Sequence, residues 1–518
     1  MERQKKKQIY MSQLDEPVQD WLIELREMTE TECMSVLQGK SLGASQDADH
    51  STKLVHNVKE GIDSIKNESN AISQDFDRLF KSVEAGEWRH LGRHGIQVTC
   101  HIRSLIQVCN QCVPEPPVYI LEQQDTVMGE CAKLAQQVDS FTRGGTLPAK
   151  VPLTNQLTFL GQTFSRLVDS IIGYLVQRLV DTLDEASVPS AVNSAISNVI
   201  SLGLEGEHMC YVLAREGGVR ALLDICRTDS LEFAHAQALR ALATVCCVPE
   251  SIMELEKESG LELLTEVLCD VKTSEGVQGE AAGVVAQITS PSLEHNQHLS
   301  GFVDNNLQDL LKALLVLCQK TSSHEVFLLA TAAVANVTFI DTLACEILHQ
   351  KQAPRHLIRH CSMSKASSLF AKDQIATVLA NMAAVNTCQS GIAENSGIEL
   401  LVQFLHERPS SYRNTAEVAA CERVQQKAAI ALTRLCREER YARSIVKLNG
   451  VPRLVQLCRF VKERNNSDAV LVACLASLRK ICTTVEDHRM SAQDHQQLIQ
   501  PRLMDSFLMC SHSDENFV

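Results

Sequence analysis

Aromatic side chains are scarce in this sequence: Phe, Trp and Tyr make up 4% of its 518 residues, and only two of them are Trp. Leu, Ala and Val supply most of the apolar residues instead. Sheets favour aromatic and β-branched residues, whereas Leu and Ala favour closely packed helices. The composition therefore predicts an all-α fold, in a chain long enough for several domains or one long solenoid.

Long apolar runs are also absent. No run reaches the roughly 18 apolar residues that a transmembrane helix needs. The basic cluster at Lys5, Lys6 and Lys7 has no apolar stretch behind it, so it is not a secretory signal. We therefore expect a cytoplasmic protein without membrane insertion, in which the 20 cysteines remain reduced and many serve as small core residues.

Motifs of catalysis are missing as well. We find no phosphate-binding glycine loop, no HExxH and no nucleophile elbow. The net charge of −14 argues against nucleic acid as the main partner. Cys109 and Cys112 form a CxxC, but the nearby Cys100 and His101 are adjacent in sequence and make a poor second pair for zinc. Ordinary helix cysteines are the better interpretation, and we expect no enzyme, metal or cofactor.

Two interleaved phrases repeat through the second half of the chain. The first is a small residue followed by apolar residues at helical spacing, as in GVRALLDIC at Gly218, GIELLVQFL at Gly397 and GVPRLVQLC at Gly450. It recurs every 42 to 53 residues. Several copies follow a polar turn, where Gly can supply the positive φ of a tight corner.

The second phrase occurs on Ala-rich stretches with helical spacing, as in VANVT at Val334 and LANMA at Leu379. Two helix types alternating at this period resemble armadillo repeats, which stack into a solenoid with a concave groove. In that family an Asn on the third helix often holds a bound peptide. The aligned positions here that make groove candidates are Asn336, Asn381, Arg434 and Lys480. The alternative is that the two Asn side chains only satisfy neighbouring turns.

Charge is unevenly distributed near the end of the repeats. Between Cys421 and Cys482 there are 13 Lys or Arg against 5 Asp or Glu. This stretch is either a solvated basic surface or a docking face for an acidic or phosphorylated partner. Both tryptophans, Trp21 and Trp88, lie outside the repeats, which argues against a nuclear import receptor, because such receptors place tryptophans in the groove.

The breaks in the pattern divide the chain into five parts. Residues 1–42 form a tail with an acidic amphipathic segment, and the small polar residues 43–53 read as a linker. Residues 54–189 carry helical spacing interrupted by VPEPPVY and predict a helical bundle. Residues 190–510 hold the repeats, and residues 511–518 form a short tail.

The acidic segment combines an apolar stripe with a high negative charge. Val18, Trp21, Leu22, Leu25 and Met28 fall on one helical face, and alternation after Met28 predicts an extended stretch. Seven acids and one base lie between Asp15 and Glu32. A helix this short is marginal in water, so the segment is expected to fold on a partner rather than to pack on its own chain.

The stretch DEPVQDWLIELREMTETECMSVLQGKSL resembles the partner-binding segment of the Inscuteable family of cell-polarity adaptors. Later stretches such as EVFLLATAAVANVTF and NSDAVLVACLASLR resemble the armadillo array of the same family. The resemblance covers the whole chain.

This resemblance implies an adaptor that orients the mitotic spindle in asymmetric cell division, recruited from the cytoplasm to the apical cell cortex. Its segment binds the tetratricopeptide repeats of LGN (Pins in flies), which connects G-protein α subunits to NuMA and dynein. The adaptor of this family also contacts the Par-complex scaffold Bazooka and forms larger assemblies with LGN. By matching position, the residues that contact the tetratricopeptide groove are Trp21, Leu22, Leu25, Met28, Glu30, Glu32 and Met34.

Two further readings remain open. The chain can instead be a generic armadillo peptide-binding scaffold of β-catenin or import-receptor type, in which the N-terminal segment is an autoinhibitory arm. The C-terminal Phe517 and Val518 resemble a PDZ ligand, in which the terminal carboxylate and an apolar last side chain enter the groove. Asn516 departs from the residue that common PDZ classes prefer at that position.

Overall fold

The computed structural model describes residues 53–142, 149–185, 188–291, 300–362, 368–412 and 414–511. Every regular element among these residues is a helix, which confirms the predicted all-α class. The helices form two compact units that are divided in sequence between Glu258 and Ser259. Within the described ranges, no helix is both long and apolar enough to cross a lipid bilayer.

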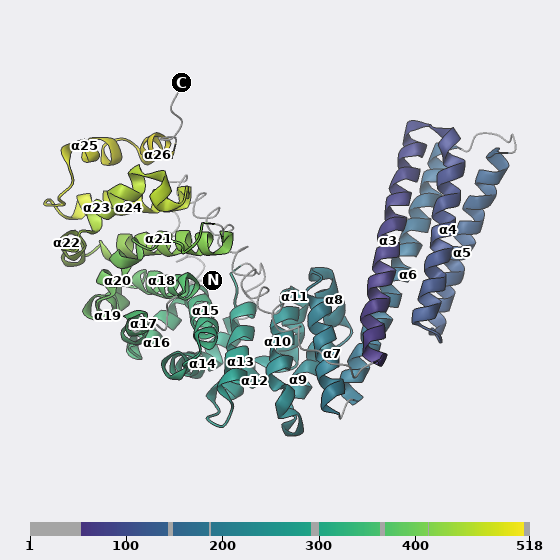
Figure 1. The fold of residues 1–518 in the computed structure, drawn as a ribbon, viewed down its shortest axis with the longest axis horizontal. Coiled ribbons are helices and arrows are strands. Elements are labelled where there is room, and N and C mark those ends of the chain that lie inside the picture. The colour runs from purple at the N-terminus through teal and green to yellow at the C-terminus, as the bar shows by residue number, and fades with distance from the viewer. Residues whose placement is uncertain are drawn as a thin grey trace. The chain divides into compact units, whose positions relative to one another are not determined.

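The first unit begins with four long helices packed side by side as a bundle (Figure 1). They are α3 Lys53–Ala85, α4 Trp88–Cys112, α5 Val118–Thr142 and α6 Lys150–Glu185. Each packs against the next in sequence, and α3 also packs against α6. Buried residues of α3 recur at Ile62, Ile65, Ile72 and Leu79, which is the spacing of one helical face.

Short helices follow the bundle in the same unit. They are α7 Pro189–Gly203, α8 Glu207–Arg215, α9 Gly218–Arg227, η2 Asp229–Ala234, α10 His235–Val245 and α11 Pro249–Lys257. Helix α6 contacts α7, α8 and α9 as well as the bundle, so its 36 residues join the two parts. An ion pair of 2.6 Å between Arg220 and Asp184 strengthens this junction.

The second unit consists of repeats that each end on a stacked helix, which follows one helix in the first two repeats and two short helices in the next three. Its first elements are α12 Gly260–Cys269, α13 Glu275–Ile288, α14 Ser300–Lys320, α15 His324–Ile340, α16 Thr342–Gln350, α17 Ala353–Ser362 and α18 Leu369–Ala383. Then follow η3 Asn386–Cys388, α19 Gln389–Glu394, α20 Gly397–Phe404, α21 Thr415–Leu435, α22 Glu439–Lys447, α23 Gly450–Arg459, η4 Val461–Arg464 and α24 Asp468–Thr484. The last elements are α25 Ala492–Asp494, η5 His495–Ile499 and α26 Leu503–Ser511.

The last helices of these repeats form one continuous layer. Helices α13, α15, α18, α21 and α24 each pack against the next, and they line the inside of the unit's curve (Figure 1). Alanines such as Ala330, Ala376 and Ala428 are fully buried between them, which allows a close approach. We call this layer the inner layer. The stacked arrangement is that of an armadillo-repeat solenoid.

Each inner-layer helix begins with the same kind of side-chain N-cap. A Ser or Asn side chain accepts a hydrogen bond from the backbone N–H three residues later, at Ser274, Ser323, Ser368, Asn414 and Ser467. Such a cap satisfies one of the four backbone donors that a helix leaves unpaired at its N-terminus. The caps therefore set where each long helix begins.

The glycines of the first phrase have a different role from the one predicted. The positive φ at the corner belongs to the preceding residue, which is Ser259, Ser396 or Asn449 in three of the copies. The prediction that Gly supplies this angle is wrong at the ESG and NSG turns, and it is confirmed at the EGG turn, where Gly217 has a φ of 85°. At Gly397 a Cβ would lie 2.6 Å from the carbonyl oxygen of Ile392, and at Gly450 it would lie 3.1 Å from that of Ile445. These glycines are required because the first turn of the second helix touches the helix before it.

A buried ionic cluster joins two inner-layer helices. Asp373 of α18 is completely buried and accepts from Arg423 Nε at 2.8 Å and from Lys427 Nζ at 2.7 Å, both on α21. Burial alone would raise the pKa of the Asp373 carboxyl, but the two cations outweigh it and hold the pKa below its ordinary value of 3.8. The cluster is therefore charged at neutral pH.

Replacing this carboxylate is expected to destabilise the second unit in a pH-dependent way. Asp373→Ala should lower the free energy of unfolding by about 3–5 kcal/mol at neutral pH, because two cations lose this counterion in a dry environment. A lowered pKa contributes stability above pH 3.8 that is lost as the pH falls through the folded-state value. The measurement is a denaturant titration at several pH values. The native chain should lose more stability below pH 4 than Asp373→Ala, and equal losses would contradict the role of the cluster.

Candidate protein-binding site

The residues predicted to bind a tetratricopeptide groove lie outside the described residues. These are Trp21, Leu22, Leu25, Met28, Glu30, Glu32 and Met34. The same holds for Phe517 and Val518 of the tail. The structure therefore bears on the groove candidates of the inner layer.

Three of the four groove candidates reach back to the inner-layer helix of the preceding repeat. Asn336 Nδ2 donates to the Ala286 carbonyl at 2.8 Å, and Arg434 Nη1 donates to the Ala380 carbonyl at 2.6 Å. Asn381 Nδ2 donates to Thr338 Oγ1 at 3.1 Å and more weakly to the Ala335 carbonyl. We call this series the carbonyl ladder.

Two rungs of the ladder satisfy carbonyls that their own helices leave unpaired. The N–H of Ser290 would normally reach Ala286, but it bonds to the carbonyl of Gln287 instead. Likewise the N–H of Ala384 bonds to Asn381 and not to Ala380. Because a buried carbonyl without a donor is costly, Asn336 and Arg434 stabilise the stacking of successive repeats.

The carbonyl ladder uses only some of the polar groups of these side chains. An amide that clamps a peptide backbone uses both its N–H₂ group and its oxygen. At Asn336 and Asn381 the N–H₂ group is engaged within the protein, and among the described residues neither amide oxygen has a donor. At Arg434 one of five N–H groups is used. These contacts give the three side chains a structural role, and their role in binding a peptide stays a prediction.

Lys480 occupies the aligned place on α24 without joining the ladder. Its side chain is half-buried and has no ion pair or hydrogen bond among the residues that the structure describes. The link from α24 to α21 is made three residues earlier, where Ser477 Oγ donates to the Ala429 carbonyl at 3.0 Å. Lys480 therefore remains open to a ligand on the inner layer.

Most cations of the basic stretch contact other groups of the protein, some in its interior and some, such as Arg440 and Arg443, at its surface. Those paired with carboxylates are Arg423, Lys427, Arg440, Arg443, Arg453 and Arg459. Two more hold backbone carbonyls: Arg464 bonds to Leu457, Cys458 and Cys510, and Arg479 bonds to Leu498, Ile499 and Pro501. The charge excess is therefore only partly a surface property.

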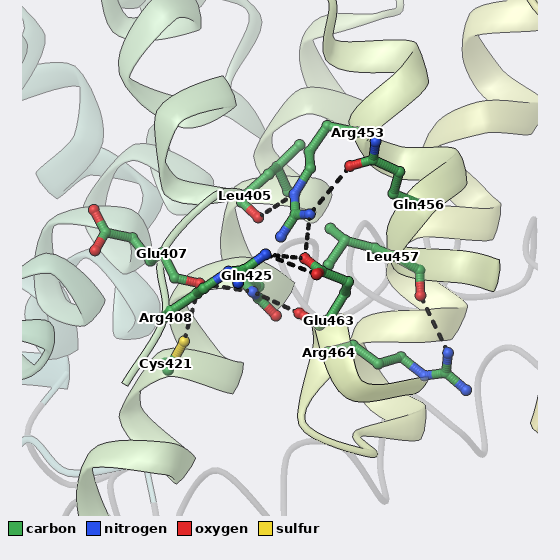
Figure 2. A network of polar contacts seen from close by, with 10 residues as sticks. All are labelled: Leu405, Glu407, Arg408, Cys421, Gln425, Arg453, Gln456, Leu457, Glu463 and Arg464. Carbon is green, nitrogen blue, oxygen red and sulfur yellow. Dashed lines mark hydrogen bonds and ion pairs between the residues drawn. The ribbon is translucent and has the colours of Figure 1, made fainter. Parts of the chain in front are cut away.

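The densest of these contacts form a polar network that joins α21, α23 and η4 to the segment after α20 (Figure 2). Arg453 is buried, donates from Nε to the Leu405 carbonyl at 2.9 Å and pairs through Nη1 with Glu463 at 2.6 Å. Glu463 also accepts from the exposed Arg408 at 2.7 Å. The hydrogen bond from Arg453 lowers the pKa of Glu463. Gln425 donates to the carbonyls of Glu407 and Glu463 and so connects both loops to α21.

Most of the cysteines that the structure describes are buried, although Cys100 and Cys269 are exposed. Cys109 is buried and its pKa rises to about 12, mainly through burial, while burial also raises the pKa of Cys112. A thiol with a raised pKa is a poor nucleophile and a poor metal ligand. Cys112 lies where α3 passes close to α4, since a Cβ on Gly61 would be 3.2 Å from its sulfur. In the described ranges, no three His, Cys, Asp or Glu side chains converge to hold a metal ion.

Comparison with known proteins assigns the chain to a family. Residues 69–518 match the family model described as "Protein inscuteable C-terminal". The chain belongs to the Inscuteable family. It is 40% identical to the protein inscuteable homolog of Homo sapiens over 519 residues, a span covering 98% of this chain and 89% of that protein. Identity to the mouse protein of the same description is 39% over the same coverage.

The N-terminal part matches a second Inscuteable model. Residues 13–61 match the model described as "Inscuteable LGN-binding domain". This span contains the whole acidic segment and the start of α3. The resemblance to the Inscuteable family that the sequence predicted is thus confirmed over both parts of the chain.

Solved structures resemble the fold. A crystal structure of an engineered protein matches with a TM-score of 0.50 and 18% identity, covering 79% of this chain and 100% of that one. At this identity the match shows the fold alone.

Two arginine variants, each of which removes one partner of the Glu463 carboxylate, test the polar network of this Inscuteable chain. Arg453→Ala should lower the free energy of unfolding by about 3 kcal/mol, because it leaves Glu463 and the Leu405 carbonyl without a buried donor. Arg408→Ala removes the exposed partner of Glu463 and should cost less than about 1 kcal/mol. Denaturant titration of both variants checks the difference. Equal effects would show that the network does not depend on the buried arginine.

Proposed function

We propose that this protein is an adaptor that binds the tetratricopeptide repeats of LGN (Pins) through its N-terminal acidic segment. The observation that carries the proposal is the match of residues 13–61 to the LGN-binding model of the family. The chemistry of the segment agrees with it, since seven acids and an apolar helical face lie within residues 15–32. Such a segment suits a concave, basic groove with apolar pockets.

The residues of the segment divide into two roles. Trp21, Leu22, Leu25 and Met28 form the apolar face that enters the groove, with Trp21 as its largest anchor. Glu30, Glu32 and Met34 belong to the extended stretch, where the two carboxylates meet basic side chains. Ordering the segment on its partner reduces its net affinity, so a large buried aromatic is needed to compensate.

The solenoid provides the second binding surface of the adaptor. In this proposal it connects LGN, and through LGN the G-protein α subunits, to a Par-complex scaffold of Bazooka type. The joined complex orients the mitotic spindle in asymmetric division and sits at the apical cell cortex, to which the cytoplasmic protein is recruited. The bundle helices α3–α6 contribute to larger assemblies with LGN. Binding rather than catalysis is the activity of such a scaffold.

Isolated peptide 12–42 is expected to bind an LGN tetratricopeptide domain tightly and with salt sensitivity. Trp21→Ala should weaken binding by about 2 kcal/mol, which is about 30-fold in Kd, because a buried aromatic anchor is lost. Isothermal titration measures both. Gln19→Ala, off the apolar face, is the matched control and should bind like the native peptide. No binding of the native peptide at low salt would overturn the proposal.

The C-terminal tail is proposed as a PDZ ligand that helps to reach a PDZ-containing polarity scaffold. Val518 would place its side chain and the terminal carboxylate in the PDZ groove. Adding one Gly after Val518 moves the carboxylate and should abolish binding. A PDZ-domain array probed with the native and the extended tail provides the measurement. Equal retention of both tails would show that the terminus is not the recognised group.

A further inference from the structure

The chain between α20 and α21 presents an exposed serine, Ser410. We call residues 408–412 the tip segment. No residue of it is helical, and 66% of Tyr412 is accessible. Hydroxyls on the neighbouring helices, such as those of Thr433 and Ser444, donate instead to a carbonyl of their own helix, at 2.8 and 3.0 Å. A protein kinase has to align the hydroxyl with the γ-phosphate of ATP, and an exposed, non-helical segment allows this.

Both ends of the tip segment are fixed to α21. Before it, the Glu407 carbonyl accepts from Gln425 Nε2 at 3.0 Å and from Cys421 Sγ at 3.3 Å (Figure 2). After it, the Asn414 side chain accepts from the backbone N–H of Glu417 at 3.2 Å and caps the helix. The tip segment is therefore accessible to an enzyme while the helices on either side of it stay folded.

A carboxylate holds the Ser410 hydroxyl. Ser410 Oγ donates to Glu417 Oε2 at 2.7 Å, and the Ser410 backbone N–H donates to Glu417 Oε1 at 3.2 Å. These two bonds, that of the hydroxyl first, lower the pKa of Glu417, so this carboxyl is ionised at neutral pH. A phosphate on Oγ would remove the donor and bring a second negative charge against the carboxylate. Modification of Ser410 therefore forces the tip segment away from Glu417.

A cation with open donors lies two residues before Ser410. Arg408 contacts Glu463 through Nη2 alone, at 2.7 and 2.9 Å, and among the described residues its Nε and Nη1 have no partner. Two residues of chain span at most about 7 Å, and in extended backbone alternate side chains point to the same side. Because Pro409 follows it, Arg408 favours extended backbone. The reach from Arg408 to a phosphate on Ser410 is thus set by the chain itself.

Binding a phosphate costs the polar network little. The Glu463 carboxylate also accepts from the buried Arg453, at 2.6 Å, and this bond does not involve Arg408. The side chain of Arg408 is 62% exposed, and exposed ion pairs contribute little to stability. A guanidinium binds phosphate through charge-assisted bonds that are stronger and are often bidentate. Arg408 is therefore free to turn towards the phosphate or to bridge it to Glu463.

We propose that Ser410 is a phosphorylation site for a Ser/Thr protein kinase and that Arg408 binds the phosphate once it has formed. In the reaction, Ser410 Oγ attacks the γ-phosphorus of ATP and the bond from this phosphorus to the ADP oxygen breaks. The hydroxyl proton passes to the catalytic base of the kinase. The product carries a charge of about −1.5 to −2 at pH 7, and the tip segment changes from a form bound to Glu417 into one bound to Arg408.

The role of Arg408 is tested without a kinase. Phosphoserine is inserted at position 410 of the full chain during translation, and its phosphorus NMR signal is followed through a pH titration at about 50 mM salt. Because Arg408 favours the dianion, the phosphate should titrate at lower pH in this chain than after Arg408→Ala. Arg443→Ala is the matched control, since Arg443 is 63% exposed and pairs with Glu439 on α22. This control should leave the titration unchanged.

A positional control separates binding by Arg408 from a general charge effect. In extended backbone the neighbouring position 411 points to the other side of the chain. Phosphoserine inserted there should titrate at the same pH with Arg408 present or replaced by Ala. Circular dichroism of each variant verifies that the helices remain folded.

The modification itself is measured on the full chain recovered from dividing cells that are treated with a phosphatase inhibitor. Cleavage after Glu releases peptide 408–417, and its fragmentation in a mass spectrometer distinguishes Ser410 from Ser411. The expected result is a phosphate on Ser410 that is absent from Ser410→Ala.

Each part of the proposal has results that would overturn it. Recovery of peptide 408–417 without phosphate, or with phosphate on Ser411 alone, would overturn the assignment of the site. Equal titration of the phosphate in the native chain and in Arg408→Ala, or an equal effect of Arg408 at position 411, would overturn the role of Arg408. None of these measurements involves LGN, so the result leaves the proposed function unaffected.

Discussion

The carbonyl ends of the inner-layer helices are the constraint on which the solenoid depends. A helix cannot satisfy its last carbonyls, and the Ala-rich packing buries them against the next repeat. Asn336 and Arg434 supply the missing donors at Ala286 and Ala380. Ser477 of α24 also bonds back to the preceding helix α21, at the Ala429 carbonyl. Each repeat therefore completes the one before it, and nearest-neighbour dependence of this kind is what gives a solenoid its cooperativity.

The sequence was sufficient for the fold class and for the phase of the repeats. Both depend on local periodicity and on small residues at fixed places, which neighbours in the chain determine. The corner angle was assigned to the wrong residue because ESG and NSG read the same whether Ser or Gly takes the positive φ. Only the short distance between a Cβ placed on Gly397 and the carbonyl oxygen of Ile392 shows that close packing is the reason for a glycine there. That distance is a property of packing and leaves no separate mark on the sequence.

The candidate binding site was only partly predictable, because packing between distant segments decides which polar groups are already paired. The number of Lys and Arg residues marks a basic stretch, but it does not show which of these cations pair with groups of the protein itself. Asp373 is 50 residues before Arg423, and nothing local marks the two as partners. Aligning the repeats found Asn336, Asn381, Arg434 and Lys480, since they share a register position. Whether a register position faces a carbonyl or open space depends on the preceding helix, so Lys480 differs from the other three.

Buried arginines stabilise the last repeats from within. Arg453 and Arg464 are buried and hold loops and helix ends, so their charge is part of the fold. Buried arginines suit this task because one planar group can serve several carbonyls. Such a framework ties loops to helix ends, as Arg453 does at the Leu405 carbonyl and Arg464 at the Cys510 carbonyl. A surface held in this way loses little entropy when it binds a partner. Much of the cation excess of the last repeats therefore stabilises the solenoid itself.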